Sequence, residues 1–188
     1  MSTNTLSVRV PPFGCPRTES SNMLNQTVRR LGLKAILIVP WLAMNLSHAS
    51  EPVFVLKAQL VVEKVYAIVG PLGQRSVANA GLNANYGFVV TEKGVILIDS
   101  GASAHSAALL EKAIAQVTPQ PVRWVLNTGS QDHRWLGNDY FARKGAQVHA
   151  LAATAQTQKS LAEQQMSSMA RFVGDQLKGT LPRQASVI

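Results

Sequence analysis

Hydrophobic and polar positions along the middle of the chain predict four strands before the first helix. Apolar and β-branched runs at 53–62 and 64–69 predict two strands, and the Gly- and Asn-rich stretch 70–85 predicts a long loop. Two more apolar runs, at 88–90 and 95–98, are separated by the tetrapeptide TEKG, which is typical of a hairpin.

From Ser103 the spacing of apolar residues changes to that of a helix. Leu110, Ile114 and Val117 lie at positions i, i+4 and i+7, Ser103 is suited to be the N-cap, and Pro119 lies beyond the end. The resulting order β-β-β-β-α-β-α-β-α is that of a layered α/β protein. The later elements are expected to be a strand at 121–129, a short helix at 133–145, a strand at 146–151 and a long helix at 152–177.

The N-terminal segment has the pattern of an export signal. After Met23 come Arg29, Arg30 and Lys34, an apolar stretch at 35–46, and the small-x-small sequence Ser-His-Ala at 47–49. The apolar run is shorter than the roughly 20 residues that span a bilayer as a helix. We therefore predict a signal peptide at 23–49, cleaved near Ala49, and a periplasmic or secreted protein without a stable membrane anchor; an uncleaved anchor is the alternative. Residues 1–22 are interpreted as a mis-assigned leader.

Charge and cysteine content narrow the function further. The net charge is +8, but the first 49 residues hold five basic side chains and one acidic one, which leaves 13 basic and 9 acidic side chains after them. This mild balance argues against a nucleic-acid partner. The single cysteine, Cys15, lies in the leader, so a metal site in the mature chain would need His, carboxylate or amide oxygen ligands.

Two loops follow predicted strands and carry polar residues. One is Asp99-Ser100-Gly101 and the other spans 128–133. In layered α/β sheets, ligands bind beyond the carboxyl ends of strands, where loops and helix N-termini converge. These two loops are therefore the candidate site.

The residues around these loops resemble a known family. "GFVVTEKGVILIDSG", a helix and "PVRWVLNTGSQDHRWLGN" resemble the first half of a metallo-β-lactamase-fold hydrolase, over about residues 60–178. The resemblance implies a four-layer αββα fold of which this chain holds the N-terminal half only, zinc, and metal-activated water attacking an ester, thioester or amide. We expect this domain at 50–178, an aberrant tail at 179–188, and a chain truncated after the first half.

A narrower resemblance concerns the second loop. "NTGSQDHRWLGN", with "VYAIVGPLGQRS" upstream, resembles the exported branch called quinoprotein relay system zinc metallohydrolases. This resemblance implies a periplasmic protein whose partner is a small-molecule substrate or a quinoprotein.

The loop departs from the motif of the superfamily, T-H-x-H-x-D-H-x-x-G-N. An ungapped alignment on Thr128 and Gly137 places Gly129 and Gln131 at the first two histidines, and His133 and Arg134 at the aspartate and last histidine. A gapped alignment would keep Asp132 and His133 on the Asp-His pair as a half-site for one metal. The cation at Arg134 opposes metal binding.

Three interpretations of the loop stay open. In the first, Gln131, Asp132 and His133 hold zinc, and Asp132 is catalytic. In the second, Asp132 caps a helix that begins near His133. In the third, Arg134, Thr128 and the helix N-terminus bind a carboxylate or phosphate without metal.

Other residues near the loops receive simpler roles. The superfamily implies that Asp99 supports the metal loop from behind, and a turn-forming Asp is the alternative. Trp135 is expected in the core, His105 in solvent and His149 packed inside a strand.

Three functions follow from these interpretations. The chain is a metal-dependent hydrolase, a non-catalytic binding protein for a quinoprotein or its partner, or an incomplete fold without activity. In the last case an uncovered sheet face would favour self-association.

Overall fold

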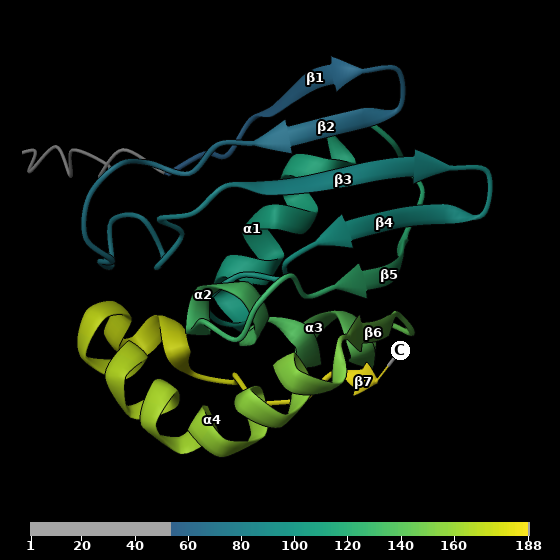
Figure 1. Ribbon diagram of the computed structural model, residues 1–188. Coiled ribbons are helices and arrows are strands. Elements are labelled where there is room, and N and C mark those ends of the chain that lie inside the picture. The colour runs from purple at the N-terminus through teal and green to yellow at the C-terminus, as the bar shows by residue number, and fades with distance from the viewer. Residues whose placement is uncertain (1–53, 188) are drawn as a thin grey trace, which may run out of the picture. The chain divides into compact units, whose positions relative to one another are not determined.

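A seven-stranded sheet organises the computed structural model, which describes residues 54–187 (Figure 1). The strands lie across the sheet in chain order; β1 to β4 are antiparallel neighbours, and β4 to β7 are parallel. The predicted leader, the signal peptide and Cys15 lie outside the described residues. The strands are β1 (Ala58–Val62), β2 (Val65–Ile68), β3 (Tyr86–Thr91), β4 (Gly94–Ile98), β5 (Val122–Leu126), β6 (Gln147–Ala150) and β7 (Ser186–Val187).

The first helix begins where its sequence predicts. Ser103 Oγ accepts from the Ser106 amide at 3.1 Å, and Ser106 Oγ accepts from the Ser103 amide at 2.8 Å, which forms a reciprocal capping box. In the part of the chain described, no helix is both long and apolar enough to cross a membrane. The helices are α1 (Ala104–Ala115), α2 (Asp132–Trp135), α3 (Asn138–Arg143), α4 (Ala152–Val173) and the 3-10 helix η1 (Gly174–Leu177).

The prediction of one helix over 133–145 is wrong, because the chain breaks into α2 and α3 at Gly137. The Gly137 amide donates to the Gly101 carbonyl at 3.1 Å, while the carbonyl of His133, four residues earlier, accepts from the Tyr86 hydroxyl at 3.1 Å. A Cβ at position 137 would lie 2.0 Å from the Ser100 carbonyl oxygen. Glycine therefore lets this turn approach the end of β4 closely.

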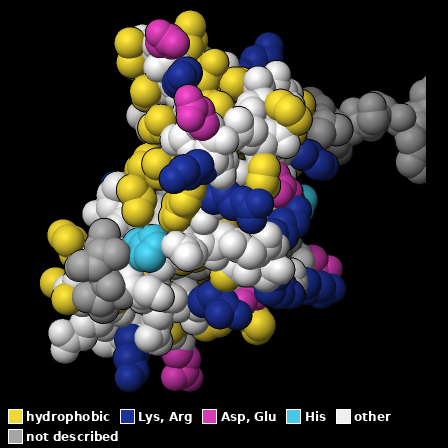
Figure 2. Space-filling model, turned by 90° about the vertical axis from the view of Figure 1, so that its right-hand side faces the viewer, with side chains coloured by type: hydrophobic (Ala, Val, Ile, Leu, Met, Phe, Trp, Pro, Cys, Tyr) yellow, Lys and Arg dark blue, Asp and Glu magenta, His cyan; other side chains and the backbone are white. Residues whose placement is uncertain are grey.

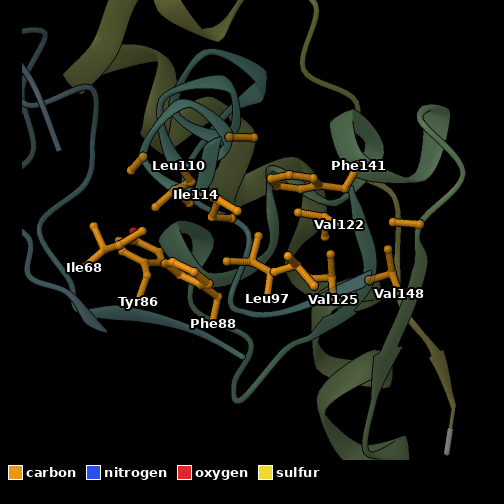
Figure 3. Packing of buried hydrophobic residues seen from close by; sticks show 14 of the residues in the cluster. Ile68, Tyr86, Phe88, Leu97, Leu110, Ile114, Val122, Val125, Phe141 and Val148 are labelled. Carbon is orange, nitrogen blue, oxygen red and sulfur yellow. The ribbon is translucent and has the colours of Figure 1, made fainter. Parts of the chain in front are cut away.

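The hydrophobic core lies between the sheet and the helices α1 and α3. Figure 3 shows Leu97 and Val125 pointing from the strands toward Leu110 and Ile114 of α1 and Phe141 of α3, and all five are buried. Burying a side chain of this size stabilises a fold by about 1.5–3 kcal/mol. Alternating residues of the same strands face the other side, where Ile96, Trp124 and Leu126 remain partly exposed. One sheet with helices against one face is the expected α/β half of the αββα fold.

Residues 179–187, expected to be a tail outside the domain, pack into it. Thr180 is buried and its hydroxyl accepts from the Ala104 amide at 2.9 Å. The Arg183 carbonyl accepts from Asn138 Nδ2 at 3.0 Å, and β7 extends the sheet beside β6. These contacts place the segment within the same packed unit as the rest of the described chain.

Candidate functional site

The two candidate loops meet at one edge of the sheet, because β4 and β5 are parallel neighbours. Asp99 follows β4 with φ of +62°, a conformation that Asp tolerates better than most residues. Its Oδ1 accepts from the Thr128 amide at 2.8 Å, and its Oδ2 accepts from Thr128 Oγ1 at 2.7 Å. Arg134 Nη1 donates to the same Oδ2 at 3.0 Å and to Thr128 Oγ1 at 2.5 Å. The buried Asp99 carboxylate therefore fixes both ends of the second loop.

A buried amide network supports the loop from behind. Asn138 Oδ1 accepts from Ser100 Oγ at 2.7 Å and from Asn127 Nδ2 at 3.1 Å. Asn127 Oδ1 in turn accepts from Asn138 Nδ2 at 2.8 Å and from Gln158 Nε2 at 3.1 Å. Sequence reasoning did not assign roles to Asn127 or Gln158; the position of Asn127 at a strand end was the available signal. The network holds the loop backbone in one arrangement.

Arg75, from the long loop before β3, reaches the start of α2. Its Nη1 donates to Asp132 Oδ2 at 2.9 Å, and its Nη2 lies 2.8 Å from Oδ1. The same Nη2 lies 3.0 Å from His133 Nδ1. Such a bidentate pair is among the stronger polar contacts in proteins. Arg75 was missed by sequence reasoning, although it lies in the stretch "GQRS".

The interpretation of Asp132 as a helix cap is wrong. The helix α2 begins at Asp132 itself, and Gln131, its N-cap, makes no side-chain capping bond. Apart from the neighbouring His133 amide, which donates to Oδ1 at 2.8 Å, the Asp132 carboxylate accepts from Arg75. The guanidinium holds the carboxylate in place of the helix amides.

The donor set of the loop does not fit a zinc ion in this arrangement. Within residues 54–187 no three His, Cys, Asp or Glu side chains gather closely enough to share a metal. Both oxygens of Asp132 and the Nδ1 of His133 already face the permanent cation of Arg75. A Cβ on Gly129 would lie 2.6 Å from Gln131 Oε1 and 3.1 Å from Arg134 Cδ. The side chains of Gln131 and Arg134 therefore fill the space that a metal-binding side chain at position 129 would need.

A polar cavity of about 370 Å³ opens beside the loop. The side chain of Arg134 lines it, and neither Nε nor Nη2 of this guanidinium makes a hydrogen bond within the described part of the chain. Its walls are Thr128, Gly129, Ser130, Gln131 and Arg134 from the loop, and Ala153, Thr154 and Thr157 from α4. Two predicted substrate-binding residues, Thr128 and Arg134, thus share one cavity.

Three further predicted residues lie outside this cavity. Trp135 is fully buried, as expected, and its Nε1 donates to Gln165 Oε1 at 2.7 Å. His105 is exposed on α1, and His149 lies half-buried in β6. These histidines do not approach the loop residues closely enough to complete a metal site.

Tyr86 contacts the start of α2, and the pKa of its hydroxyl depends on both arginine–aspartate pairs. Burial, followed by the negative charge of Asp99, raises the pKa of the Tyr86 hydroxyl well above its usual value. The positive charges of Arg134 and Arg75 lower it, but do not offset the burial. Tyr86 is therefore a neutral donor to the His133 carbonyl at physiological pH.

Comparisons with known proteins agree with this architecture. Residues 80–171 match the metallo-beta-lactamase superfamily. The metallo-beta-lactamase FIM-1 from Pseudomonas aeruginosa, in its mono-zinc form, is 15% identical with a TM-score of 0.50, over 72% of this chain and 51% of that one. A metallo-beta-lactamase from Pontibacter korlensis is 22% identical with a TM-score of 0.45, over 57% and 47%. A search of curated proteins gave no match.

The chain spans about half the length of these two solved structures. The likeness to FIM-1 concerns the fold, and the predicted α/β class is confirmed. The described domain has the metallo-beta-lactamase fold, and its residues 80–171 match the model of the metallo-beta-lactamase superfamily.

Proposed function

We propose that this domain binds a small carboxylate- or phosphate-bearing molecule in the loop cavity, through Arg134 and without a metal ion. The observation that carries the proposal is the way Arg134 is held. One terminal nitrogen binds Asp99 and Thr128, while the other, Nη2, makes no hydrogen bond within residues 54–187, and the side chain lines the cavity. This terminal nitrogen can donate a charge-assisted hydrogen bond to an oxygen of a carboxylate or phosphate.

The rest of the cavity suits an anion as well. Ser130 and Thr154 offer hydroxyl groups, and Gln131 offers an amide. The helix α4 begins at Ala152, and its N-cap, Leu151, makes no side-chain capping bond. The first amides of this helix therefore keep their capacity to donate, and the helix dipole favours negative charge at that end.

A calorimetric titration of the folded full chain with inorganic phosphate, and separately with acetate, tests the proposal. Wild type is expected to bind at least one probe saturably, and Arg134→Gln to weaken binding at least about tenfold, because it removes a charge-assisted contact. Arg171→Gln is the matched control, since Arg171 is exposed on α4 and does not line the cavity. Equal affinity in all three proteins, or no saturable binding by wild type, would contradict the proposal.

A hydrolase-type function is the second candidate, and the match of residues 80–171 to the metallo-beta-lactamase superfamily supports it. Zinc on Gln131, Asp132 and His133 would compete with Arg75, because both Asp132 oxygens already face this permanent cation at 2.9 and 2.8 Å and it repels a second cation there. Metal content by mass spectrometry separates the candidates. Stoichiometric zinc that is lost in His133→Ala supports the hydrolase, whereas a folded metal-free protein whose phosphate binding is insensitive to a chelator supports the anion site.

Export and a quinoprotein partner remain proposals supported by the sequence alone. Residues 23–49 support a periplasmic or secreted location, and the stretch "NTGSQDHRWLGN" supports association with a quinoprotein system. N-terminal sequencing of protein recovered from outside the cytoplasm tests the first point. A chain that starts near Ser50 agrees with export and cleavage, a chain that keeps residues 23–49 there contradicts cleavage, and protein found only in the cytoplasm contradicts export.

A further inference from the structure

A second polar cavity, of about 390 Å³, lies between α3, β6 and residues 183–186. It shares no residue with the loop cavity. No carboxylate side chain lines it, so its wall holds no negative charge that would repel an anion. Its polar wall consists of one guanidinium, one imidazole, two amides and one hydroxyl, from Arg183, His149, Gln147, Gln184 and Ser186.

The buried carboxylate of Asp139 holds Arg183 in the wall of this cavity. Arg183 Nε donates to Asp139 Oδ1 at 2.8 Å, and the two terminal nitrogens of Arg183 make no hydrogen bond within residues 54–187. The Asp139 side chain is 3% exposed, whereas that of Arg183 is 53% exposed. The pair therefore fixes the inner part of the guanidinium and leaves its outer part accessible to a ligand.

A second arginine shares the same carboxylate. Arg143 Nε lies 2.8 Å from Asp139 Oδ2, and Arg143 Nη2 donates to the Gly179 carbonyl at 3.2 Å. One carboxylate offsets only one guanidinium, so these three side chains together carry one net positive charge. In the candidate loop site, by contrast, each arginine has an aspartate of its own. The second cavity therefore lies beside a surplus of positive charge.

The other polar groups of the wall suit oxygen acceptors. Gln147, Gln184 and Ser186 are exposed, and their amide and hydroxyl groups can donate hydrogen bonds. The Nδ1 of His149 is buried without a partner, so no hydrogen bond fixes that side of the ring. Figure 2 views the side on which Figure 1 places β6 and β7, and dark-blue Lys and Arg side chains spread over the lower half of this side.

We propose that this cavity binds a small tetrahedral oxyanion of the phosphate or sulfate class, with Arg183 as its anchor. The outer nitrogens of Arg183 donate charge-assisted hydrogen bonds to the anion, as guanidinium groups do in many phosphate sites. The surplus charge of the two arginines offsets part of the charge of the anion. The oxygens that do not face Arg183 accept from the amides and the hydroxyl of the wall.

Histidine-selective NMR spectra of the folded full chain, titrated with sodium sulfate at constant ionic strength, test the proposal. Sulfate is the first probe, because its charge does not change near neutral pH, and inorganic phosphate is the second. The imidazole signals of His149 are expected to shift saturably, since this ring lines the cavity. Those of His105, exposed on α1, are the internal reference and should not saturate. The variant His149→Gln identifies the signals.

Two variants act on the site in different ways. Arg183→Gln removes the anchor and should weaken sulfate binding at least about tenfold. Gln147→Glu adds a negative charge to the wall at an exposed position, should weaken binding to a similar extent, and leaves the Asp139 pair intact if Arg183→Gln does not fold. Arg171→Gln is the matched charge control, and Arg134→Gln removes the anchor of the loop cavity; neither residue lines the second cavity, so both variants should keep the His149 shift.

Four results would overturn the proposal. Wild type could show no saturable shift of His149, or Gln147→Glu or a folded Arg183→Gln could bind sulfate as wild type does. Arg171→Gln could weaken binding as much as Arg183→Gln, which would indicate a general charge effect. A His149 shift that disappears in Arg134→Gln would place the anion in the loop cavity instead.

Discussion

The two arginine–aspartate pairs of the site use their guanidinium groups differently. Arg75 places both terminal nitrogens on Asp132 and one of them near His133 as well. Arg134 commits only Nη1 to Asp99, its Nη2 makes no hydrogen bond within the described residues, and its side chain lines a cavity. Both aspartate side chains are nearly buried, at 7% and 3% exposure, so each needs a cation. The difference indicates that both terminal nitrogens of Arg75 stabilise the fold, whereas one terminal nitrogen of Arg134 remains available to a ligand.

The largest effect is expected from removing the carboxylate that positions Arg134. Asp99→Ala leaves the Thr128 amide and the Arg134 guanidinium without their acceptor and places alanine at positive φ. We expect the free energy of unfolding to fall by about 2–4 kcal/mol, measured by urea denaturation. Asp99→Asn tolerates the backbone conformation and keeps one acceptor, so it should lose less. A cost below about 1 kcal/mol for Asp99→Ala would mean that the loop does not depend on this carboxylate.

Replacing Arg75 should affect stability and leave ligand binding intact. Arg75→Gln leaves the mostly buried Asp132 carboxylate without its bidentate partner, and we expect a loss of about 2 kcal/mol in the free energy of unfolding. Its affinity for phosphate should stay within about threefold of wild type, because Arg75 does not line the cavity. Arg134→Gln should also lose stability, because Asp99 loses its cation, but unlike Arg75→Gln it should lose affinity as well. If Arg75→Gln abolishes binding in a folded protein, the distinction between the two arginines is wrong.

The parts of the fold that sequence could predict are those set by local pattern. The hairpin at 91–94, the capped start of α1 and the run of strands follow from periodicity and turn residues within short windows. The position of the site also followed, because Asp99 and Thr128 end neighbouring parallel strands. Such features depend on residues that are close in sequence or on a topology that many chains share.

The parts that could not be predicted depend on distant partners. Arg75 meets Asp132 across 57 positions, from a loop without periodic pattern. The break between α2 and α3 requires the amide of Gly137 to bond to Gly101, which the local sequence HRWLGNDYF does not reveal. The strand β7 has two residues, too few to show alternation, and is recognised only by its pairing with β6. Tertiary contacts decided each of these cases.

The smallest effect concerns Tyr86, which faces both pairs and reports on them through pH. Burial and Asp99 raise its pKa in the folded state above the unfolded value of 10.0, so the unfolded chain loses this proton first as pH rises. The stabilising contribution of neutral Tyr86 is therefore complete below about pH 10 and declines above it.

Tyr86→Phe removes one hydrogen bond, to the His133 carbonyl, and should cost about 1 kcal/mol at neutral pH. Urea denaturation between about pH 8 and about pH 11 should show a shallower loss of stability in Tyr86→Phe than in wild type. Tyr66→Phe is the control, because the half-buried Tyr66 stacks on Phe88 and its hydroxyl makes no hydrogen bond to either pair within residues 54–187. Equal slopes in Tyr86→Phe and wild type would contradict the raised pKa of Tyr86 and would mean that solvent reaches its hydroxyl. A shallower slope would confirm that burial keeps the Tyr86 hydroxyl neutral where it supports the start of α2 between the two pairs.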